Sequence, residues 1–367
     1  MTRTPLSARG AAAVALLLAT SCSDSGPHGP GAPVSLALVS GDAQSSTVAS
    51  PLPLPITIRV ADGASRATPG ILVRFAVASG GGQVAAATAS TNDSGLVHAT
   101  WTLGVAAGEQ SLTATLSADP ALATIVHATA TPDAPAALEL LDTLSSTAPV
   151  GAPVAAHLRV ALVDRFDNAS PVAGVEITAS LDDGAGGPSA RNQLRGAVTA
   201  MTNASGLADF TQLTIVGDTG AVSLAFRAPA LKSASARLRV VTGVPARLDV
   251  VGPTTVAGVV AQNGTPLRVR AVDASGNAVA GVRVAFAFVN TNLQTVTDAS
   301  GIASFAQWTI PTKAGTYQLV ASAPNLPSVI FGVTASAGPP AGTRAVDHLR
   351  ADRERGQHWT TDQCSSG

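Results

Sequence analysis

Short runs in which apolar and polar residues alternate recur through most of the chain, between residues 32 and 337. Clear examples are the runs 56–60, 158–164 and 267–273. An alternation with a period of two residues is typical of a half-buried β-strand, and glycine, proline, asparagine and aspartate separate the runs as they do at turns. Between the N-terminal segment and the C-terminal tail, no stretch has helical periodicity over three turns. The pattern therefore predicts an all-β protein.

One turn motif occurs three times, in the segments 91–97, 202–208 and 297–303. Each copy reads threonine, then asparagine or aspartate, any residue, serine, glycine and an aliphatic residue. The Asn or Asp side chain caps such a turn, and the glycine adopts the positive φ that leads into the next strand. Similar runs precede and follow each copy, so a unit of about 100 residues is repeated, which is the size of a β-sandwich. We predict three tandem β-sandwiches.

The sequence predicts six segments, with boundaries where the composition or the repeat changes. They are a signal peptide at 1–21, Cys22 with a flexible tether at 22–31, β-sandwich domains at 32–131, 132–243 and 244–337, and a charged tail at 338–367. The mixed charges of the tail predict a short solvated helix or disorder. Cys364 in the tail is either a free thiol or a site that cross-links two chains.

The three repeats differ in phase after the turn motif. Trp101 lies six positions after the turn glycine of the first repeat, whereas Leu213 and Trp308 lie seven positions after theirs. A slip of one residue moves a side chain to the opposite face of a strand. We therefore predict a β-bulge just after Phe210 and just after Phe305, which lets all three large side chains point into their cores.

The N-terminal segment has the order of a secretory signal. Residues 1–10 contain Arg3 and Arg9 and no acidic residue. The apolar run 11–19 follows, and small residues lead from it to Cys22. A run of about ten apolar residues is too short for a transmembrane helix, which needs about 20. The protein is therefore predicted to be exported rather than held by a membrane-spanning helix.

The residues around Cys22 resemble the lipobox of bacterial lipoproteins, in which the cysteine is lipidated and becomes the new N-terminus. The segment 18–22 reads Leu-Ala-Thr-Ser-Cys, with Ala19 where the family usually has leucine and with Leu18 one position further out. The alternative is an ordinary signal peptidase site beside an incidental cysteine. The resemblance implies a membrane anchor at Cys22, and Ser23 after it resembles the outer-membrane class of these lipoproteins.

A second motif lies between the strands of each repeat. It is complete in 273–282, Asp-Ala-Ser-Gly-Asn-Ala-Val-Ala-Gly-Val, while 164–168 has Asp167 in place of the glycine and 61–65 departs most. Together with the turn motif and the tryptophan strand, it resembles bacterial Ig-like domains of the invasin/intimin type over about residues 32 to 337. The resemblance implies an Ig-like β-sandwich and a surface, rod-forming or adhesive role, and it implies no catalytic residue.

The composition narrows the possible functions. Charged residues make up only 12% of the 367 residues and the net charge is −1, which argues against nucleic-acid binding because that needs a basic surface. Two cysteines cannot form a disulfide framework. No local catalytic motif is present and no two of the six histidines have metal-ligand spacing, so we predict no enzyme, no cofactor and no metal.

Acidic residues that lie close together are candidates for calcium, which prefers six to eight oxygen ligands. The candidate sets are Asp164 with Asp167, Asp182 with Asp183, and Asp273 with Asn277. They stand where turns need Asn or Asp, so capping of turns is the preferred interpretation. The aromatic residues of the predicted strands are likewise expected to pack in the cores rather than to form a sugar-binding surface.

The second repeat contains a loop, 182–195, that is about ten residues longer than its counterparts. Long loops on a rigid β-scaffold often bind partners, so this loop is a candidate contact loop. The alternative is that the loop varies in length without any function. The candidate contact residues are Asp182, Asp183, Arg191, Asn192 and Arg195.

Together these features predict a non-enzymatic cell-surface lipoprotein that acts as a stalk, an adhesion module or a protein-binding module. Its predicted partners are the membrane, through a lipid on Cys22, and a protein or glycan at the cell surface. The alternative is a secreted or periplasmic carbohydrate-binding protein or an accessory module of an extracellular hydrolase.

Overall fold

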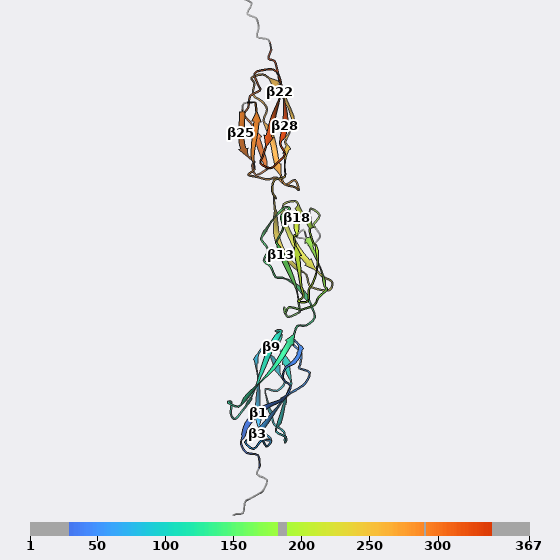
Figure 1. Cartoon of the computed structure of the whole chain (residues 1–367), viewed down its shortest axis with the longest axis vertical. Helices are drawn as coiled ribbons and strands as arrows, with labels where there is room; N and C mark the ends of the chain where they lie inside the picture. The colour runs from blue at the N-terminus through green and yellow to red at the C-terminus, as the bar shows by residue number, and fades with distance from the viewer. Residues whose placement is uncertain (1–28, 183–188, 290, 340–367) are drawn as a thin grey trace, which may run out of the picture.

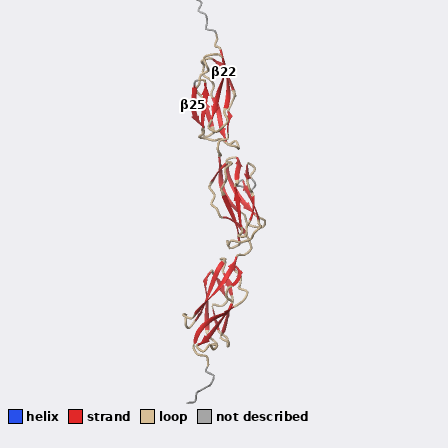
Figure 2. Ribbon diagram, in the orientation of Figure 1, coloured by secondary structure: helices blue, strands red, loops and turns tan. Residues whose placement is uncertain are grey.

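The computed structural model describes residues 29–182, 189–289 and 291–339 (Figure 1). All regular elements of these residues are β-strands, which confirms the all-β prediction (Figure 2). The segment predicted as signal peptide lies outside the described residues, as do Cys22, Asp183 and the part of the predicted charged tail beyond residue 339.

The strands form three successive β-sandwiches, each with a three-stranded sheet facing a five-stranded sheet. In the first sandwich these sheets are β1 (Pro33–Ser40), β3 (Ile56–Asp62) and β7 (Leu96–Ala99), and β2 (Gln44–Thr47), β10 (Ala123–Thr131), β9 (Gly108–Leu116), β4 (Leu72–Ser79) and β6 (Thr88–Ser90). A separate pair consists of β5 (Gly82–Val84) and β8 (Trp101–Leu103).

The second sandwich repeats this order. Its sheets are β11 (Ala137–Leu140), β13 (His157–Val163) and β17 (Leu207–Thr211), and β12 (Thr147–Pro149), β20 (Ala234–Val241), β19 (Gly220–Arg227), β14 (Glu176–Asp182) and β16 (Thr199–Met201). The separate pair is β15 (Asn192–Arg195) with β18 (Thr214–Gly217).

The third sandwich keeps the two facing sheets, but its described residues form no separate pair. The sheets are β21 (Arg247–Val250), β23 (Leu267–Val272) and β26 (Ile302–Phe305), and β22 (Thr255–Val259), β28 (Val329–Ser336), β27 (Gly315–Ser322), β24 (Arg283–Phe288) and β25 (Thr291–Val296). The three sandwiches follow one another end to end along the long axis of the molecule (Figure 1).

Each sandwich has its own hydrophobic core, built from residues of one repeat apart from one side chain described below. Aromatic side chains occupy the cores: Phe210 packs on Phe226 with ring centroids 5.1 Å apart, and Phe286 stacks on Phe305 at 5.5 Å. Such pairs favour tilted or offset geometries and stabilise small cores beyond the effect of the buried area. Most of the few aromatic residues are thus used for packing.

The phase difference between repeats has a different cause from the one predicted. Trp101, Leu213 and Trp308 are all buried, as expected. The second repeat has no β-bulge, however: β17 ends at Thr211 and a new strand, β18, begins at Thr214 and pairs with β15 instead of β13. Two residues, Gln212 with a φ of 56° and Leu213, separate β17 from β18, whereas one residue separates β7 from β8 in the first sandwich, so the longer break absorbs the extra residue.

The turn motif is held by a fixed set of hydrogen bonds. In the second sandwich the Oδ1 atom of Asn203 accepts bonds from the N–H groups of Ser205 and Leu207, at 2.9 and 3.1 Å. The hydroxyl of buried Thr202 accepts a bond from the N–H of Val175 and donates one to the carbonyl of Val172. The motif thereby connects both sheets of the sandwich.

We expect Gly206→Ala to lower the free energy of unfolding of the second sandwich by about 2 to 4 kcal/mol. Gly206 has a φ of 73°, and an added Cβ would overlap the carbonyl oxygen of Ser170. Gly174→Ala is the matched control, because Gly174 has a φ of 80° but open space around it. Urea denaturation with hydrogen exchange read by mass spectrometry would measure each sandwich separately, and equal losses for both variants would contradict the steric explanation.

Candidate functional site

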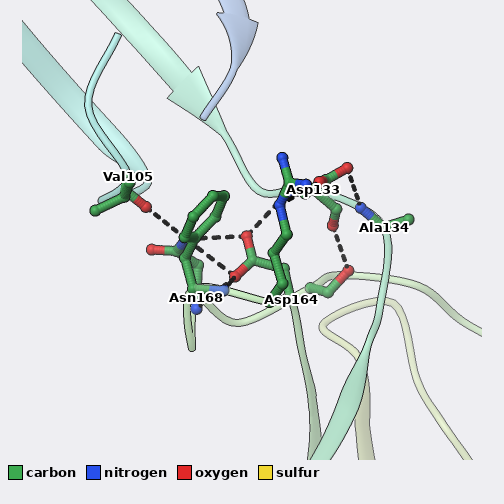
Figure 3. Close-up of polar contacts among 8 residues, drawn as sticks. Val105, Asp133, Ala134, Asp164 and Asn168 are labelled. Atoms are coloured by element: carbon green, nitrogen blue, oxygen red, sulfur yellow. Dashed lines mark hydrogen bonds and ion pairs between the residues drawn. The ribbon is translucent and has the colours of Figure 1, made fainter. Parts of the chain in front are cut away.

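Polar side chains form a connected group of hydrogen bonds where one sandwich meets the next. At the first joint, Asn168 of the second sandwich reaches the loop of the first sandwich that follows β8 (Figure 3). Its Nδ2 atom donates to the carbonyl of Val105 at 2.8 Å, and its Oδ1 atom accepts from the N–H of Ala107 at 2.8 Å. One carboxamide therefore binds both a donor and an acceptor of the neighbouring sandwich.

A buried carboxylate holds this asparagine in place. Asp164, which is 1% exposed, accepts bonds from the Nδ2 atom of Asn168 at 2.9 Å and from its backbone N–H at 3.0 Å. The same carboxylate accepts a bond from the N–H of Asp133 in the linker between the sandwiches, at 3.0 Å (Figure 3). Asp164 thus connects the linker, the turn and, through Asn168, the preceding sandwich.

An aromatic side chain adds an apolar contact to the first joint. Phe166 lies in the turn between Asp164 and Asn168, yet it packs against the hydrophobic core cluster of the first sandwich. The guanidinium of Arg165 lies 4.7 Å from the ring centroid of Phe166 and 3.3 Å from the carboxylate of Asp133. The first joint therefore combines hydrogen bonds with a small shared apolar contact.

The second joint repeats the polar part of this arrangement. The Nδ2 atom of Asn277 donates to the carbonyl of Gly217 at 2.8 Å, and the hydroxyl of Ser275 accepts from the N–H of Gly217 at 3.1 Å. Asp273 is fully buried and accepts bonds from the N–H of Gly243 in the linker and from the Nδ2 atom of Asn277, both at 3.0 Å. Both joints thus rest on an aspartate and an asparagine four residues apart.

The corresponding turn of the first sandwich has the aspartate without the asparagine. Asp62 accepts bonds from the N–H groups of Gly31, Ala64 and Arg66, each at 2.9 Å. Arg66 stands where the other two turns have asparagine, and its Nε atom lies 3.2 Å from the Asp62 carboxylate. Binding of the incoming chain by the aspartate is therefore common to all three turns.

The aspartates are held in the ionised form. Burial raises the pKa of Asp164, but the hydrogen bonds from Asn168, Asp133 and Phe166 outweigh it and leave the pKa below its ordinary value. Asp273 has a lowered pKa for the same reasons, since the bonds from Gly243, Asn277 and Ser275 outweigh its burial. The hydrogen bonds from Gly31 and Arg66 lower the pKa of Asp62 to about 2.

Because the folded protein depresses the pKa of Asp62, this carboxylate stabilises the first sandwich above about pH 4 and loses that effect as pH falls toward about 2. We therefore expect Asp62→Asn to lower the urea midpoint of the first sandwich at neutral pH. The difference from the unmodified chain should shrink as pH falls through this window. A difference that stays constant with pH would contradict an ionised Asp62.

Two of the three calcium candidate sets, those with Asp164 and Asp273, serve as turn caps. Asp164 and Asp273 accept backbone N–H groups, while Asp167 lies at a φ of 64°, the conformation that Gly276 adopts in the third sandwich. Asp182 forms an ion pair with Arg227 at 2.6 Å. In the described part of the chain, no three His, Cys, Asp or Glu side chains are grouped as metal ligands.

The predicted contact residues fall on the edge of the second sandwich nearest the third. Arg191 and Arg195 are exposed and line a cleft of about 330 Å³ whose far wall includes Gly217 and Ser275 of the second joint. Asn192 between them is 8% exposed and its Oδ1 atom has no hydrogen-bond partner. The structure thus brings the two arginines together beside the joint, places Asn192 inside the sandwich, and leaves Asp182 in its ion pair with Arg227.

Sequence reasoning did not identify Asn168 and Asn277 as residues that join sandwiches. It treated the Asp-to-Asn motif as a turn. The available signal was the asparagine four residues after the aspartate in 164–168 and 273–277, at the position where the first repeat has Arg66. None of the described residues forms a helix that could cross a membrane.

The fold and the joints define a tandem Ig-like β-sandwich protein. No protein-family model and no curated protein matches the sequence. Among solved structures, the chain is similar to FdeC, an adhesin of Escherichia coli, with 18% identity and a TM-score of 0.47 over 83% of this chain and 99% of that one.

Two further solved structures are similar to this chain. InvD of Yersinia pseudotuberculosis has 15% identity and a TM-score of 0.37 over 82% of this chain and 98% of that one. Invasin, a bacterial integrin-binding protein, has 12% identity and a TM-score of 0.37 over 83% of this chain, which spans 60% of the invasin chain.

Proposed function

We propose that the protein is a non-enzymatic stalk of the cell surface, in which three Ig-like domains, 32–131, 132–243 and 244–337, hold a binding surface away from the membrane. The observation that carries this proposal is the Asp–Asn turn at both joints. Each turn fixes a sandwich to its linker and to the preceding sandwich. A chain of domains without such contacts would bend freely at its linkers.

The use of large side chains supports a stalk over a protein that binds sugars by stacking them on aromatic rings. Sugar-binding surfaces commonly expose aromatic rings, whereas Trp101 and Trp308 are buried in cores of the described residues. The exposed faces of the sheets carry small polar side chains instead, as in β9 with Ser111, Thr113 and Thr115. Such faces suit a spacer.

The anchor of the proposed stalk is a lipid on Cys22. We expect Cys22→Ala to move the protein from the membrane fraction to the soluble exported fraction, and the unmodified chain to incorporate labelled fatty acid. Cys364→Ala is the matched control and should leave membrane partition unchanged. Membrane partition that survives Cys22→Ala, with no label in the unmodified chain, would contradict the anchor.

A second part of the proposal concerns the contact surface beside the second joint. Arg191, just before β15, and Gln193 and Arg195 within it alternate along the chain and are exposed on one face. Two guanidinium groups in one cleft favour a sulfated glycan as the ligand, because arginine binds sulfate-like oxygens with two donors at once.

The contact can be tested by retention on an immobilised sulfated glycan at increasing salt. We expect Arg191→Glu combined with Arg195→Glu to weaken binding by at least about tenfold. The matched control is Arg237→Glu with Arg239→Glu, which changes the same charge on the exposed strand β20 of the same sandwich. Equal losses in both pairs, or no retention of the unmodified chain, would contradict a specific contact at β15.

A further inference from the structure

The third sandwich differs from the other two at one edge of its five-stranded sheet. In the first two sandwiches the edge strands β6 and β16 are three residues long. The strands that precede them in the chain, β5 and β15, lie outside this sheet and pair with β8 and β18. In the third sandwich the next strand along the chain is β25, which is six residues long and pairs over its full length with β24.

This edge strand lacks the usual protection against further pairing. Its sequence, Thr-Asn-Leu-Gln-Thr-Val, has no charge and no proline, and no described strand pairs with its outer side. Proteins normally shorten, charge or cover such edges, because the free backbone N–H and C=O groups can bind another strand. A long, neutral and uncovered edge is therefore a binding surface for an extended strand.

Three apolar side chains in and next to β24 and β25 are exposed. Val289, Leu293 and Val296 are 63%, 37% and 53% exposed. Leu293 lies opposite Phe286, which is fully buried, so Leu293 is on the inner face of the sheet and is left uncovered at its edge. A strand added beside β25 would cover Leu293.

We propose that β25 pairs antiparallel with β25 of a second copy of this chain. The strand is self-complementary about a two-fold axis through Leu293. That register places the two Leu293 side chains against each other on the inner face, and it places Asn292 opposite Gln294 on the outer face, where their amides supply both donors and acceptors. The pairing joins two five-stranded sheets into one continuous sheet.

The orientation of the pair gives it a role. Because β25 runs along the long axis of the molecule, antiparallel pairing points the two chains in opposite directions (Figure 1). Their N-terminal ends then lie on opposite sides of the contact, so chains anchored on two cells meet through their third sandwiches. The bridging of cells depends on the proposed N-terminal anchor, whereas the self-association does not.

The test is sedimentation velocity of the purified full chain, both unmodified in detergent and as Cys22→Ala, between about 1 and 200 µM, where weak protein pairs dissociate. We expect a monomer–dimer equilibrium in both preparations. Leu293→Lys and Leu293→Glu should each weaken the dimer by at least about tenfold, since each places two like charges opposite one another. Ile330→Lys, an equally charged change at an exposed position of β28, should leave the equilibrium unchanged.

Mixing the two Leu293 variants gives the sharpest outcome. The new lysine of one chain would face the new glutamate of the other, so the mixture should form a dimer although each variant alone is monomeric. An unmodified chain that stays monomeric, equal effects of Leu293→Lys and Ile330→Lys, or no dimer in the mixture would overturn the proposal. Small-angle scattering supplies a second check, because an antiparallel dimer is longer than the monomer and a parallel one is not.

The two proposals fail in different ways. Loss of the dimer with membrane anchoring intact would remove the homophilic contact and keep the stalk. Loss of anchoring by the unmodified chain, with the dimer present, would remove the bridging role alone.

Discussion

Asp273→Ala should lower the free energy of unfolding of the third sandwich by about 3 kcal/mol. The fully buried carboxylate of Asp273 accepts bonds from three backbone N–H groups, those of Gly243, Ser275 and Asn277. Removing the acceptor leaves the buried N–H of Gly243 and the partly buried N–H groups of Ser275 and Asn277 without this partner. Each unsatisfied buried donor costs about 1 to 3 kcal/mol, and water that enters relieves the cost at the partly buried ones. Urea denaturation read sandwich by sandwich through hydrogen exchange would measure the loss.

A second aspartate of the same sandwich provides the control. Asp298 caps the turn before β26 through bonds to the N–H groups of Ser300 and Ile302, at 2.8 and 3.0 Å, but the contact is exposed to solvent. Water can replace the carboxylate there, so Asp298→Ala should cost about 1 kcal/mol. Equal losses of unfolding free energy for both variants would show that the burial of Asp273 and its bond to Gly243 do not contribute to stability.

The second large effect concerns the joints. We expect the double variant Asn168→Leu and Asn277→Leu to keep all three sandwiches folded but to lose the fixed arrangement between them. Leucine has a similar size and cannot form the bonds to Val105, Ala107 and Gly217. Small-angle scattering should then report a shorter average maximum dimension and a broader range of shapes than for the unmodified chain.

Two controls accompany the joint variant. Asn203→Leu changes an asparagine that caps a turn inside the second sandwich and contacts no neighbour, so the shape of the molecule should be retained. The two single variants should differ in how much they change the shape of the molecule. The first joint keeps the apolar contact of Phe166 after Asn168→Leu, whereas the second joint depends more on Asn277. A rod shape that survives the double variant would assign stiffness to the linkers instead.

Much of this fold could be predicted from local sequence. The turn motif requires particular chemistry at each position, a hydroxyl at Thr202, a capping amide at Asn203 and a positive φ at Gly206, so it could be recognised wherever it occurs. The alternation of apolar residues identified the strands because one face of each sheet is buried. Both signals depend on residues close together in the chain.

The features that local sequence did not reveal depend on distant contacts. The strand break at Gln212 was interpreted as a β-bulge, since the phase shift shows an extra residue but does not show which strand pairs next. The role of Asn277 was hidden because its partner, Gly217, lies 60 residues away. The uncovered edge at β25 had a weak signal in the shorter third repeat, which lacks the chain that forms β15 in the second.

The stiffness of the joints can be measured most directly by spin-label distances across the second joint. Labels at Ser235→Cys on β20 and Thr334→Cys on β28, in a full chain with Cys22→Ala and Cys364→Ala, report the second sandwich relative to the third. A stalk held by Asp273 and Asn277 predicts one narrow distance distribution, which Asn277→Leu broadens. A broad distribution in the chain with intact joints would contradict a stiff stalk.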